Sequence, residues 1–437
     1  MTPRELAFKI LKNAASGATY SNIAVDNALK KNEMSDADAG LLTAIVMGVT
    51  ERLLTLDYII DKLASRPDDV DADARALLRM GIYQVAYLDR IPEYAAVNET
   101  VSLAPRRCRG FVNAIMREYL RRKQKGRLSE LFPDEDADPV GYLSVYYSFP
   151  RDVCERFLEI YGLQRTRKIF EIFNRPPKLT LRINTLKISR ADYARLLEER
   201  GISYTLSERL ENAILLEGVS FAALPGFSEG YFFIQDEASQ ICVEAVGAEK
   251  DMLMIDACSC PGSKSFGSAI KMENRGRILS FDLHKSKLSL IENSAKRLGI
   301  DIITAAERDG RMLDESLVGC ADRVLCDVPC SGIGVIAKKP EIRYKSLSDF
   351  ARLPEIQLAI LENCSKYVKS GGNLIYSTCT VLPEENAENV ERFLAAHPEF
   401  SAVDFKVGDV ESENGMLSLS PDLHGTDGFF VAKFIKN

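Results

Sequence analysis

Two cysteines stand in short motifs that suit nucleophilic chemistry. Cys330 lies in the run Cys326-Asp-Val-Pro-Cys330-Ser-Gly332, and Cys379 follows the apolar run that ends in Tyr376-Ser-Thr. Each motif comes directly after a predicted buried strand, and a cysteine at a strand's C-terminal tip, near a helix N-terminus, is well placed to ionise. A lone cysteine is more often a buried structural residue. Two cysteines in similar settings favour thiols on one rim of a shared sheet.

Such a pair of thiols, with a carboxylate nearby, suits methyl transfer to carbon five of cytosine. That carbon is not nucleophilic in the aromatic ring. A thiolate that adds to carbon six converts the ring to an enamine, which attacks a sulfonium methyl group; a base then removes the C5 proton and the thiol leaves. Asp327 could hydrogen-bond the pyrimidine edge near N3 and so favour addition. Strand position alone allows either Cys330 or Cys379 to attack.

A strand-to-helix turn upstream has the features of a cofactor loop. The run Asp256-Ala-Cys-Ser-Cys-Pro-Gly-Ser-Lys264 would expose backbone N–H groups and a helix N-terminus to a polar ligand. It matches neither the GxGxxG pattern of NAD sites nor the GxxxxGK[ST] phosphate-binding loop. Asp282 ends the next predicted strand, where a carboxylate can accept ribose hydroxyls, and Asp309-Gly310 follows the third strand and could contact an adenine edge. Acids at successive strand ends predict a nucleoside site.

The elements that would position these groups form a doubly wound α/β sheet, because strands and helices alternate from residue 235 onward. The predicted strands span residues 251–257, 276–283, 302–307, 322–327, 373–377 and 428–434. The predicted helices span residues 263–271, 285–298, 353–367 and 384–397. The fifth strand is entered through a turn at Gly371-Gly372, and Pro383 with two acids would open the last helix.

Three domains are predicted along the chain. Residues 1–128 contain helical patterns only, and an acidic, proline-containing linker spans 129–141. Residues 142–234 form a small α+β module, and the Rossmann-like domain spans 235–437. Within the module we expect helices at 152–161, 164–174 and 189–200, and strands at 175–185, 202–206 and 213–216.

One stretch is strongly basic although the chain is acidic overall, with a formal net charge of −7. From Arg106 to Arg127 there are nine Lys or Arg against one acid, Glu118. Such a run is usually a solvated helix face, but in an acidic protein it is an equally good candidate for phosphate contact. The candidate RNA-binding residues are Arg106, Arg107, Arg109, Arg117, Arg175, Lys178 and Arg182.

Composition excludes several other classes. The ten cysteines show no CxxC pairs with metal spacing and there are only three histidines, so we expect no metal centre and free thiols in a reducing cytosol. The sequence has no run of eighteen apolar residues, so no membrane span is predicted. The N-terminus also lacks a signal-peptide core. We therefore expect a cytoplasmic protein.

Two of the three segments resemble RNA-binding modules. Arg79-Met-Gly-Ile-Tyr-Gln84, the run from Arg90 to Val101 and Arg109-Gly-Phe-Val-Asn-Ala-Ile-Met-Arg117 resemble the NusB family, a small all-α RNA-binding fold. Leu181-Arg-Ile-Asn-Thr185 resembles the RNA-binding insertion that precedes the catalytic domain in ribosomal-RNA cytosine methyltransferases.

The catalytic motifs together resemble the RsmB (Sun/NOP2) family of S-adenosylmethionine-dependent rRNA cytosine-5 methyltransferases. The resemblance rests on the 256–264 loop, the acids and both cysteine motifs, and Val381–Asn386 and Asp427–Phe430 extend it. It implies that Cys379 is the nucleophile, that Cys330 resolves the adduct and releases product, and that Asp327 acts beside them. It assigns the methyl-donor pocket to Cys258, Ser259, Cys260, Pro261, Gly262, Ser263, Lys264, Asp282, Asp309 and Asp327. DNA cytosine methyltransferases lack the second cysteine, so the pair favours RNA.

The sequence departs from this family at a few positions. Ser263 stands where the loop usually has glycine, which matters if the position needs a positive φ. Val328 replaces a usual alanine, and Lys339 stands where close relatives often carry histidine. Alternative functions are a tRNA cytosine-5 methyltransferase and a non-catalytic RNA-binding or ribosome assembly protein. The N-terminal domain favours 16S rRNA by analogy, naked or within an assembly intermediate, and we expect a monomer.

Overall fold

The computed structural model describes residues 1–14, 21–219 and 221–437, which form two compact units. The first unit comprises residues 1–175 and 336–347, and the second comprises 176–335 and 348–437. In this division the predicted linker and the helices after it belong to the same unit as the N-terminal helices. The domain boundaries predicted at residues 128, 141 and 234 stay a prediction.

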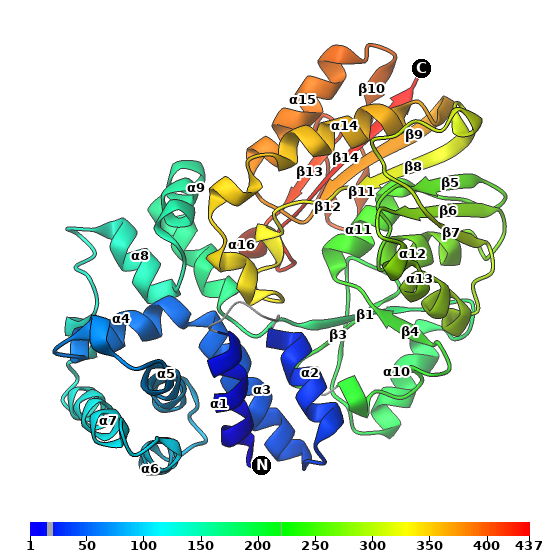
Figure 1. Cartoon of the computed structure of the whole chain (residues 1–437). Helices are drawn as coiled ribbons and strands as arrows, with labels where there is room; N and C mark the ends of the chain where they lie inside the picture. Colours follow the sequence, from blue (N-terminus) through cyan, green and yellow to red (C-terminus); the bar gives the residue numbers. More distant parts are fainter. Residues whose placement is uncertain (15–20, 220) are drawn as a thin grey trace. The chain divides into compact units, whose positions relative to one another are not determined.

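The first unit is helical, as the sequence predicts. Its α-helices are α1 (Pro3–Ala14), α2 (Ser21–Lys31), α3 (Asp36–Glu51), α4 (Leu53–Leu63), α5 (Ala72–Tyr87), α6 (Glu93–Leu103), α7 (Arg109–Gln124), α8 (Pro139–Tyr147) and α9 (Arg151–Phe173) (Figure 1). Gly162, at φ +68°, interrupts α9, which confirms the two helices predicted on either side of it. Apolar residues of α1 and α3 to α7 share one buried core.

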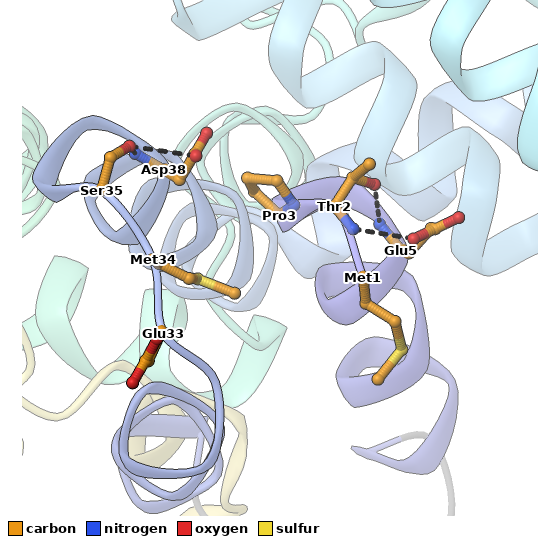
Figure 2. Close-up of a pocket in the computed structure, with 8 residues that line it drawn as sticks. All are labelled: Met1, Thr2, Pro3, Glu5, Glu33, Met34, Ser35 and Asp38. Atoms are coloured by element: carbon orange, nitrogen blue, oxygen red, sulfur yellow. Dashed lines mark hydrogen bonds between the residues drawn. The ribbon is translucent and has the colours of Figure 1, made fainter.

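Polar residues at the starts of α1 and α3 border a cavity of about 700 Å³ (Figure 2). Thr2 and Glu5 form a reciprocal capping box: the Thr2 N–H donates to the Glu5 carboxylate at 2.7 Å, and the Glu5 N–H donates to Thr2 Oγ1 at 3.2 Å. Ser35 Oγ accepts from the Asp38 N–H at 3.2 Å. These polar groups are engaged in helix capping, so the cavity follows from the way the two helices begin.

The segment 336–347 belongs to the first unit although the chain on both sides of it belongs to the second. Its 3₁₀ helix η6 (Pro340–Tyr344) carries Arg343, which is only 1% exposed. The guanidinium donates to the carbonyls of Glu51 (2.9 Å), Tyr147 (3.4 Å) and Phe173 (3.3 Å), which are the last residues of α3, α8 and α9.

Arg343 therefore closes the C-termini of three helices at once. Helix C-terminal carbonyls lack intrahelical donors and carry the negative end of the helix dipole, so a buried cation satisfies both. Burial lowers the pKa of Arg343, and the stacked Phe149 ring, 4.7 Å from the guanidinium carbon, contributes a cation–π contact. The Tyr344 hydroxyl donates to the same end of α3, at 2.6 Å from the Thr50 carbonyl.

The second unit begins with a four-stranded antiparallel sheet in the order β2-β3-β1-β4. The strands are β1 (Leu179–Ile183), β2 (Thr205–Leu206), β3 (Ala213–Leu216) and β4 (Phe232–Ile234). Helix α10 (Arg190–Glu199) crosses over between β1 and β2, and Ser189 caps it by accepting from the Asp192 N–H. The predicted small α+β module is confirmed here.

The rest of the second unit is built on an eight-stranded mixed sheet (Figure 1). Its strands are β5 (Leu253–Asp256), β6 (Arg277–Asp282), β7 (Ile303–Glu307), β8 (Ala321–Asp327), β9 (Val368–Thr378), β10 (Phe400–Ala402), β13 (Met416–Leu419) and β14 (Phe429–Lys436). The path runs β10-β14-β9-β8-β5-β6-β7, with β13 paired to β14. Strands β5 to β9 are parallel, and β14 is antiparallel to β9.

Helices cover both faces of this sheet (Figure 1). One face packs against α11 (Glu237–Val246), α12 (Ser263–Lys271) and α13 (Lys285–Leu298), and the other packs against α14 (Leu353–Ser365) and α15 (Ala387–Ala396). Alternate strand residues feed the two cores: Met254 and Ile255, for example, point to opposite faces. The unit also contains the short pair β11 (Lys406–Val407) and β12 (Val410–Glu411) and the helix α16 (Pro421–His424).

Two local predictions are corrected. Strand β9 begins at Val368 and runs through Gly371 (φ +76°), so the glycines lie inside the strand, where its pairing with β8 shifts register. The predicted helix 384–397 begins as a 3₁₀ turn, η8 (Pro383–Glu385), and continues as α15 only from Ala387. The break falls at Asn386, whose side chain bonds Thr378 and the Thr380 carbonyl instead of continuing the helix.

Among the described residues, no single helix is long and apolar enough to cross a membrane. The bent pair α3–α4 passes such a test only when its two helices are joined across a 76° bend.

Replacing Arg343 by alanine should destabilise the first unit, because buried helix carbonyls lose their donors. We expect its free energy of unfolding to fall by about 3 kcal/mol or more, since each hydrogen bond to a charged group contributes about 1.5–3 kcal/mol. Scanning calorimetry of the full chain measures this, with the 84%-exposed Arg66→Ala as a matched control. A change within about 0.5 kcal/mol of that control would contradict the capping role.

Candidate functional site

The cysteine motifs and the cofactor-type loop meet at one edge of the large sheet. The chain runs from β5 to β6 and β7 on one side, then returns to β8 on the other, so the order reverses between β5 and β8. In open α/β sheets ligands bind at the carboxyl ends of strands beside such a reversal. Asp256 ends β5, Asp282 ends β6, Asp327 ends β8, and Cys379 directly follows β9. The predicted placement of these residues at strand ends is confirmed.

The two thiols are in direct contact. Cys330 Sγ lies 2.9 Å from Cys379 Sγ, and the Cys379 backbone N–H donates to Cys330 Sγ at 3.2 Å. The hydrogen bond with Cys379, and then burial, raise the pKa of Cys330 well above its ordinary value. Either sulfur can donate the hydrogen bond that joins the pair, so a proton on one thiol can stabilise a thiolate on the other.

A buried ion pair stands beside the thiols. Lys264 Nζ donates to Asp327 Oδ2 at 2.7 Å, Ser377 Oγ donates to Asp327 Oδ1 at 2.8 Å, and the ammonium lies 5.0 Å from the centre of the Phe429 ring. Burial alone would lower the pKa of Lys264, but Asp327, with help from neighbouring thiols that include Cys379, raises it above the ordinary value. Lys264 stays charged, and its field favours negative charge on Cys379.

Glu385 is a functional candidate that sequence reasoning missed. It is 1% exposed, and its Oε2 accepts from the Ser331 N–H at 2.9 Å and from Gln357 Nε2 at 2.8 Å. Gln357 also donates to the Pro329 carbonyl at 3.0 Å, and the Tyr376 hydroxyl donates to the Glu385 carbonyl at 2.6 Å. The backbone on both sides of Cys330 is thus tied to the segment after Cys379. The signal in the sequence was the Pro-Glu-Glu-Asn run at 383–386, which was interpreted as a helix start and as part of the family resemblance, with no role given to Glu385.

The loop after β5 is built for close backbone approach. Gly262 has φ +105°, and a Cβ there would lie 2.5 Å from the Phe266 ring, so glycine is required. Ser263 begins α12, is not among the residues with positive φ, and its carbonyl accepts from Gln235 Nε2 at 3.1 Å. Position 263 does not have a positive φ, so serine causes no backbone strain there.

The acids of this edge have different environments. Burial raises the pKa of Asp256 to about 7, and its Oδ2 accepts from Ser265 Oγ at 2.7 Å. Asp282 Oδ1 accepts from the His284 N–H at 2.9 Å. Asp309 is held by Arg311, which bonds both carboxylate oxygens and lowers the pKa of Asp309. Both oxygens of Asp309 therefore already accept a hydrogen bond from Arg311 before any ligand binds.

The remaining loop residues have structural roles. Ser259 is mostly buried, and its backbone N–H and its hydroxyl both donate to the Phe281 carbonyl, at 2.8 and 3.0 Å. Cys258 is flanked by acids, and burial raises the pKa of its thiol. Cys260 is partly exposed, and its Sγ lies 3.8 Å from the Lys287 carbonyl. These contacts fix the loop that carries Pro261 and Gly262.

The predicted RNA-binding residues are not all available to a ligand. Arg106, Arg107, Arg109 and Arg117 are exposed on and just before α7, although Arg107 pairs with Asp71 and Asp73. Arg175 and Lys178 are also exposed. Arg182 is 2% exposed and bonds Glu244 Oε1 at 3.1 Å, inside the second unit. We leave Arg182 out of the proposed RNA-binding set, because its guanidinium is used for packing.

Comparison with known families covers most of the chain. The NusB family matches residues 1–121, a ferredoxin-like domain of RsmF/B-type methyltransferases matches 149–220, and the family described as 16S rRNA methyltransferase RsmB/F matches 244–435. The domain order agrees with the helical, α+β and Rossmann-like succession described above.

Individual relatives extend this match over the full length. A probable ribosomal RNA small subunit methyltransferase B of Bacillus subtilis is 37% identical, covering 99% of this chain and 98% of the relative. A similarly named protein of Synechocystis is 34% identical over the whole of both chains. Among solved structures, PH0851 has a TM-score of 0.81 and 26% identity, covering 100% of this chain and 99% of its own. These similarities show that the chain belongs to the RsmB family of ribosomal RNA small subunit methyltransferases.

Proposed function

We propose that this protein transfers a methyl group from S-adenosylmethionine to carbon five of a cytosine in 16S ribosomal RNA, through a covalent adduct with Cys379. The observation that carries the proposal is the contact between Cys330 and Cys379, 2.9 Å apart, beside the Lys264–Asp327 ion pair. Methylation of an exocyclic amine or a ribose hydroxyl would need no thiol, whereas C5 methylation needs one to activate the ring.

Local geometry supports S-adenosylmethionine as the donor. The turn at Gly262 brings backbone close to the space above β5, and Asp282 offers a carboxylate at the end of β6 for a ribose. A Cβ on Gly310 would come within 3.2 Å of Ile360, so the backbone is also tightly packed where an adenine would lie. NSun6 from Pyrococcus horikoshii, solved with SFG, an analogue of this donor, has the same fold with a TM-score of 0.60.

The chain's own residues account for activation of the base. Lys264 favours the Cys379 thiolate, which attacks carbon six. Each oxygen of Asp327 already accepts one hydrogen bond, but a carboxylate oxygen has a second lone pair. Asp327 can therefore still accept a hydrogen bond from the pyrimidine edge. The donor, when bound, supplies an electrophilic methyl group. Cys330, whose sulfur lies 2.9 Å from that of Cys379, is placed to donate a proton to Cys379 as it leaves after C5 is deprotonated.

The other candidate functions receive less support. Relatives that match over the full length are named for ribosomal RNA, which favours rRNA over tRNA. A purely non-catalytic assembly protein would have no use for paired thiols with a buried ion pair beside them. Because the substrate is ribosomal RNA, we place the reaction in the cytoplasm.

Bisulfite sequencing of 16S rRNA from cells with and without the protein tests the proposal: a cytosine protected only when the protein is present is expected, and identical profiles would reject it.

Replacing Cys379 by serine should reduce methyl transfer by at least about a thousandfold, because a hydroxyl is a far weaker nucleophile than a thiolate. Donor binding, measured by calorimetry, should persist. The matched control is Cys320→Ser, which changes a partly exposed cysteine remote from the proposed chemistry. Turnover of the Cys379 variant near that of the wild type would refute the nucleophile assignment.

Replacing Cys330 by alanine should trap the covalent protein–RNA adduct, because release of Cys379 loses its proton source. The adduct would migrate as a slower band on a denaturing gel and would disappear in the Cys330→Ala/Cys379→Ser double variant. Full activity with no shifted band would remove the proposed role of Cys330 in product release.

Charge reversal on α7 should weaken RNA binding without affecting the thiols. For Arg109→Glu with Arg117→Glu we expect a loss of affinity and a decrease of about 1–2 in the slope of log K against log salt, because phosphate contacts release counterions. Filter binding of 16S rRNA at several salt concentrations measures both, with Arg66→Glu as the control. An unchanged slope would mean that the basic run is only a solvated face.

A further inference from the structure

A second cavity in the first unit is lined by aromatic rings and guanidinium groups. It has a volume of about 590 Å³, in the range of small-ligand sites. Tyr142 and Tyr146, one turn apart on α8, stack with ring centres 5.1 Å apart and an interplanar angle of 15°. Phe132 packs at an angle on Tyr146, 5.5 Å away. We call this the tyrosine cavity.

The aromatic wall has spare binding capacity. Tyr146 is 44% exposed although it stacks on Tyr142. Among the residues that the structure describes, the hydroxyls of Tyr142 and Tyr146 make no hydrogen bond. Tyrosines at interfaces typically bury one ring face and keep the hydroxyl for a partner. A planar ligand could therefore stack on Tyr146 and extend the existing pair.

Two of the three arginines that line the cavity already interact with other side chains of the protein. Arg167 pairs with Glu135, and the guanidinium of Arg52 lies 5.0 Å from the centre of the Tyr87 ring. Arg175 is the most open: its side chain is 69% exposed and only 4.0 Å from the Glu171 carboxylate. Three guanidinium groups face two carboxylates, Glu135 and Glu171, which leaves a net positive charge at the mouth.

We propose that the tyrosine cavity binds an unpaired nucleotide of the RNA substrate, with the base stacked on Tyr146 and the phosphate beside Arg175. Sequence-tolerant recognition of single-stranded RNA combines aromatic stacking with arginine contacts to the backbone, and the cavity supplies both within one unit. The RNA identity of the ligand rests on the proposed function. The site is separate from the thiols and from the basic run on α7, so it is an additional anchor for the substrate.

Photo-crosslinking of the wild-type chain to 16S rRNA, followed by mass spectrometry, tests the site without a mutation. A nucleotide attached to Tyr142 or Tyr146 is expected. Absence of RNA adducts on every peptide that lines the cavity, while α7 peptides crosslink, would overturn the proposal and leave the cavity to a ligand of another class.

Substitutions give the energetic test. Tyr146→Ala should weaken binding of 16S rRNA about tenfold, in the range of one lost base stack, while Tyr146→Phe should stay within about twofold. Tyr58→Ala, a partly exposed tyrosine on α4 outside the cavity, is the matched control. Equal losses in the alanine and phenylalanine variants, or no loss in either, would overturn the stacking role. Arg175→Gln should reduce the salt slope by about one.

Failure of this inference and failure of the proposed function can be told apart. If the wild type protects a cytosine from bisulfite while Tyr146→Ala binds RNA as tightly as Tyr58→Ala, the cavity proposal is wrong and the methyl transfer stands. If Tyr146→Ala loses RNA affinity but the wild type protects no cytosine, the cavity stands and the C5 chemistry is wrong. Circular dichroism melting curves of each variant confirm that the comparison is between folded proteins.

Discussion

The geometry of the site depends on one buried carboxylate. Glu385 holds the backbone N–H of Ser331 directly and the Pro329 carbonyl through Gln357, so the residues on both sides of Cys330 are fixed to the segment that follows Cys379. Both of these bonds reach Glu385 Oε2, and they hold the backbone around Cys330 to the segment that follows Cys379. The turn at η8, which interrupts the expected helix, is the local consequence of directing Glu385 inward.

A comparable constraint acts on the chain that continues from the Cys330 loop. After Val335 it enters the first unit, where Arg343 satisfies the C-terminal carbonyls of α3, α8 and α9, and it returns to the second unit after Leu347. The segment 336–347 follows β8 in the chain and precedes α14, and both of these elements lie in the second unit. The chain therefore passes from one unit to the other after residues 175, 335 and 347.

Charge is distributed to suit two different tasks. Within the site, Lys264 is buried against Asp327 and close enough to Cys379 to influence its ionisation. On the first unit, exposed arginines face solvent. Screening by salt makes the contribution of each to the folding free energy small, but the same exposure leaves them accessible to RNA phosphates. This separation explains how a chain with a net charge of −7 can be proposed to bind RNA.

The sequence by itself determined the order of strands and helices, the placement of Asp282, Asp327 and Cys379 at strand ends, and, through family motifs, the roles expected of the two cysteines. These features are local: apolar periodicity and turn chemistry are written in neighbouring residues. Only the tertiary structure decided that Arg182 is buried, that Ser263 is unstrained, that Lys264 reaches Asp327, and that Glu385 and Arg343 organise distant backbone. A side chain's partners depend on which segments the fold brings together, and no local pattern records that.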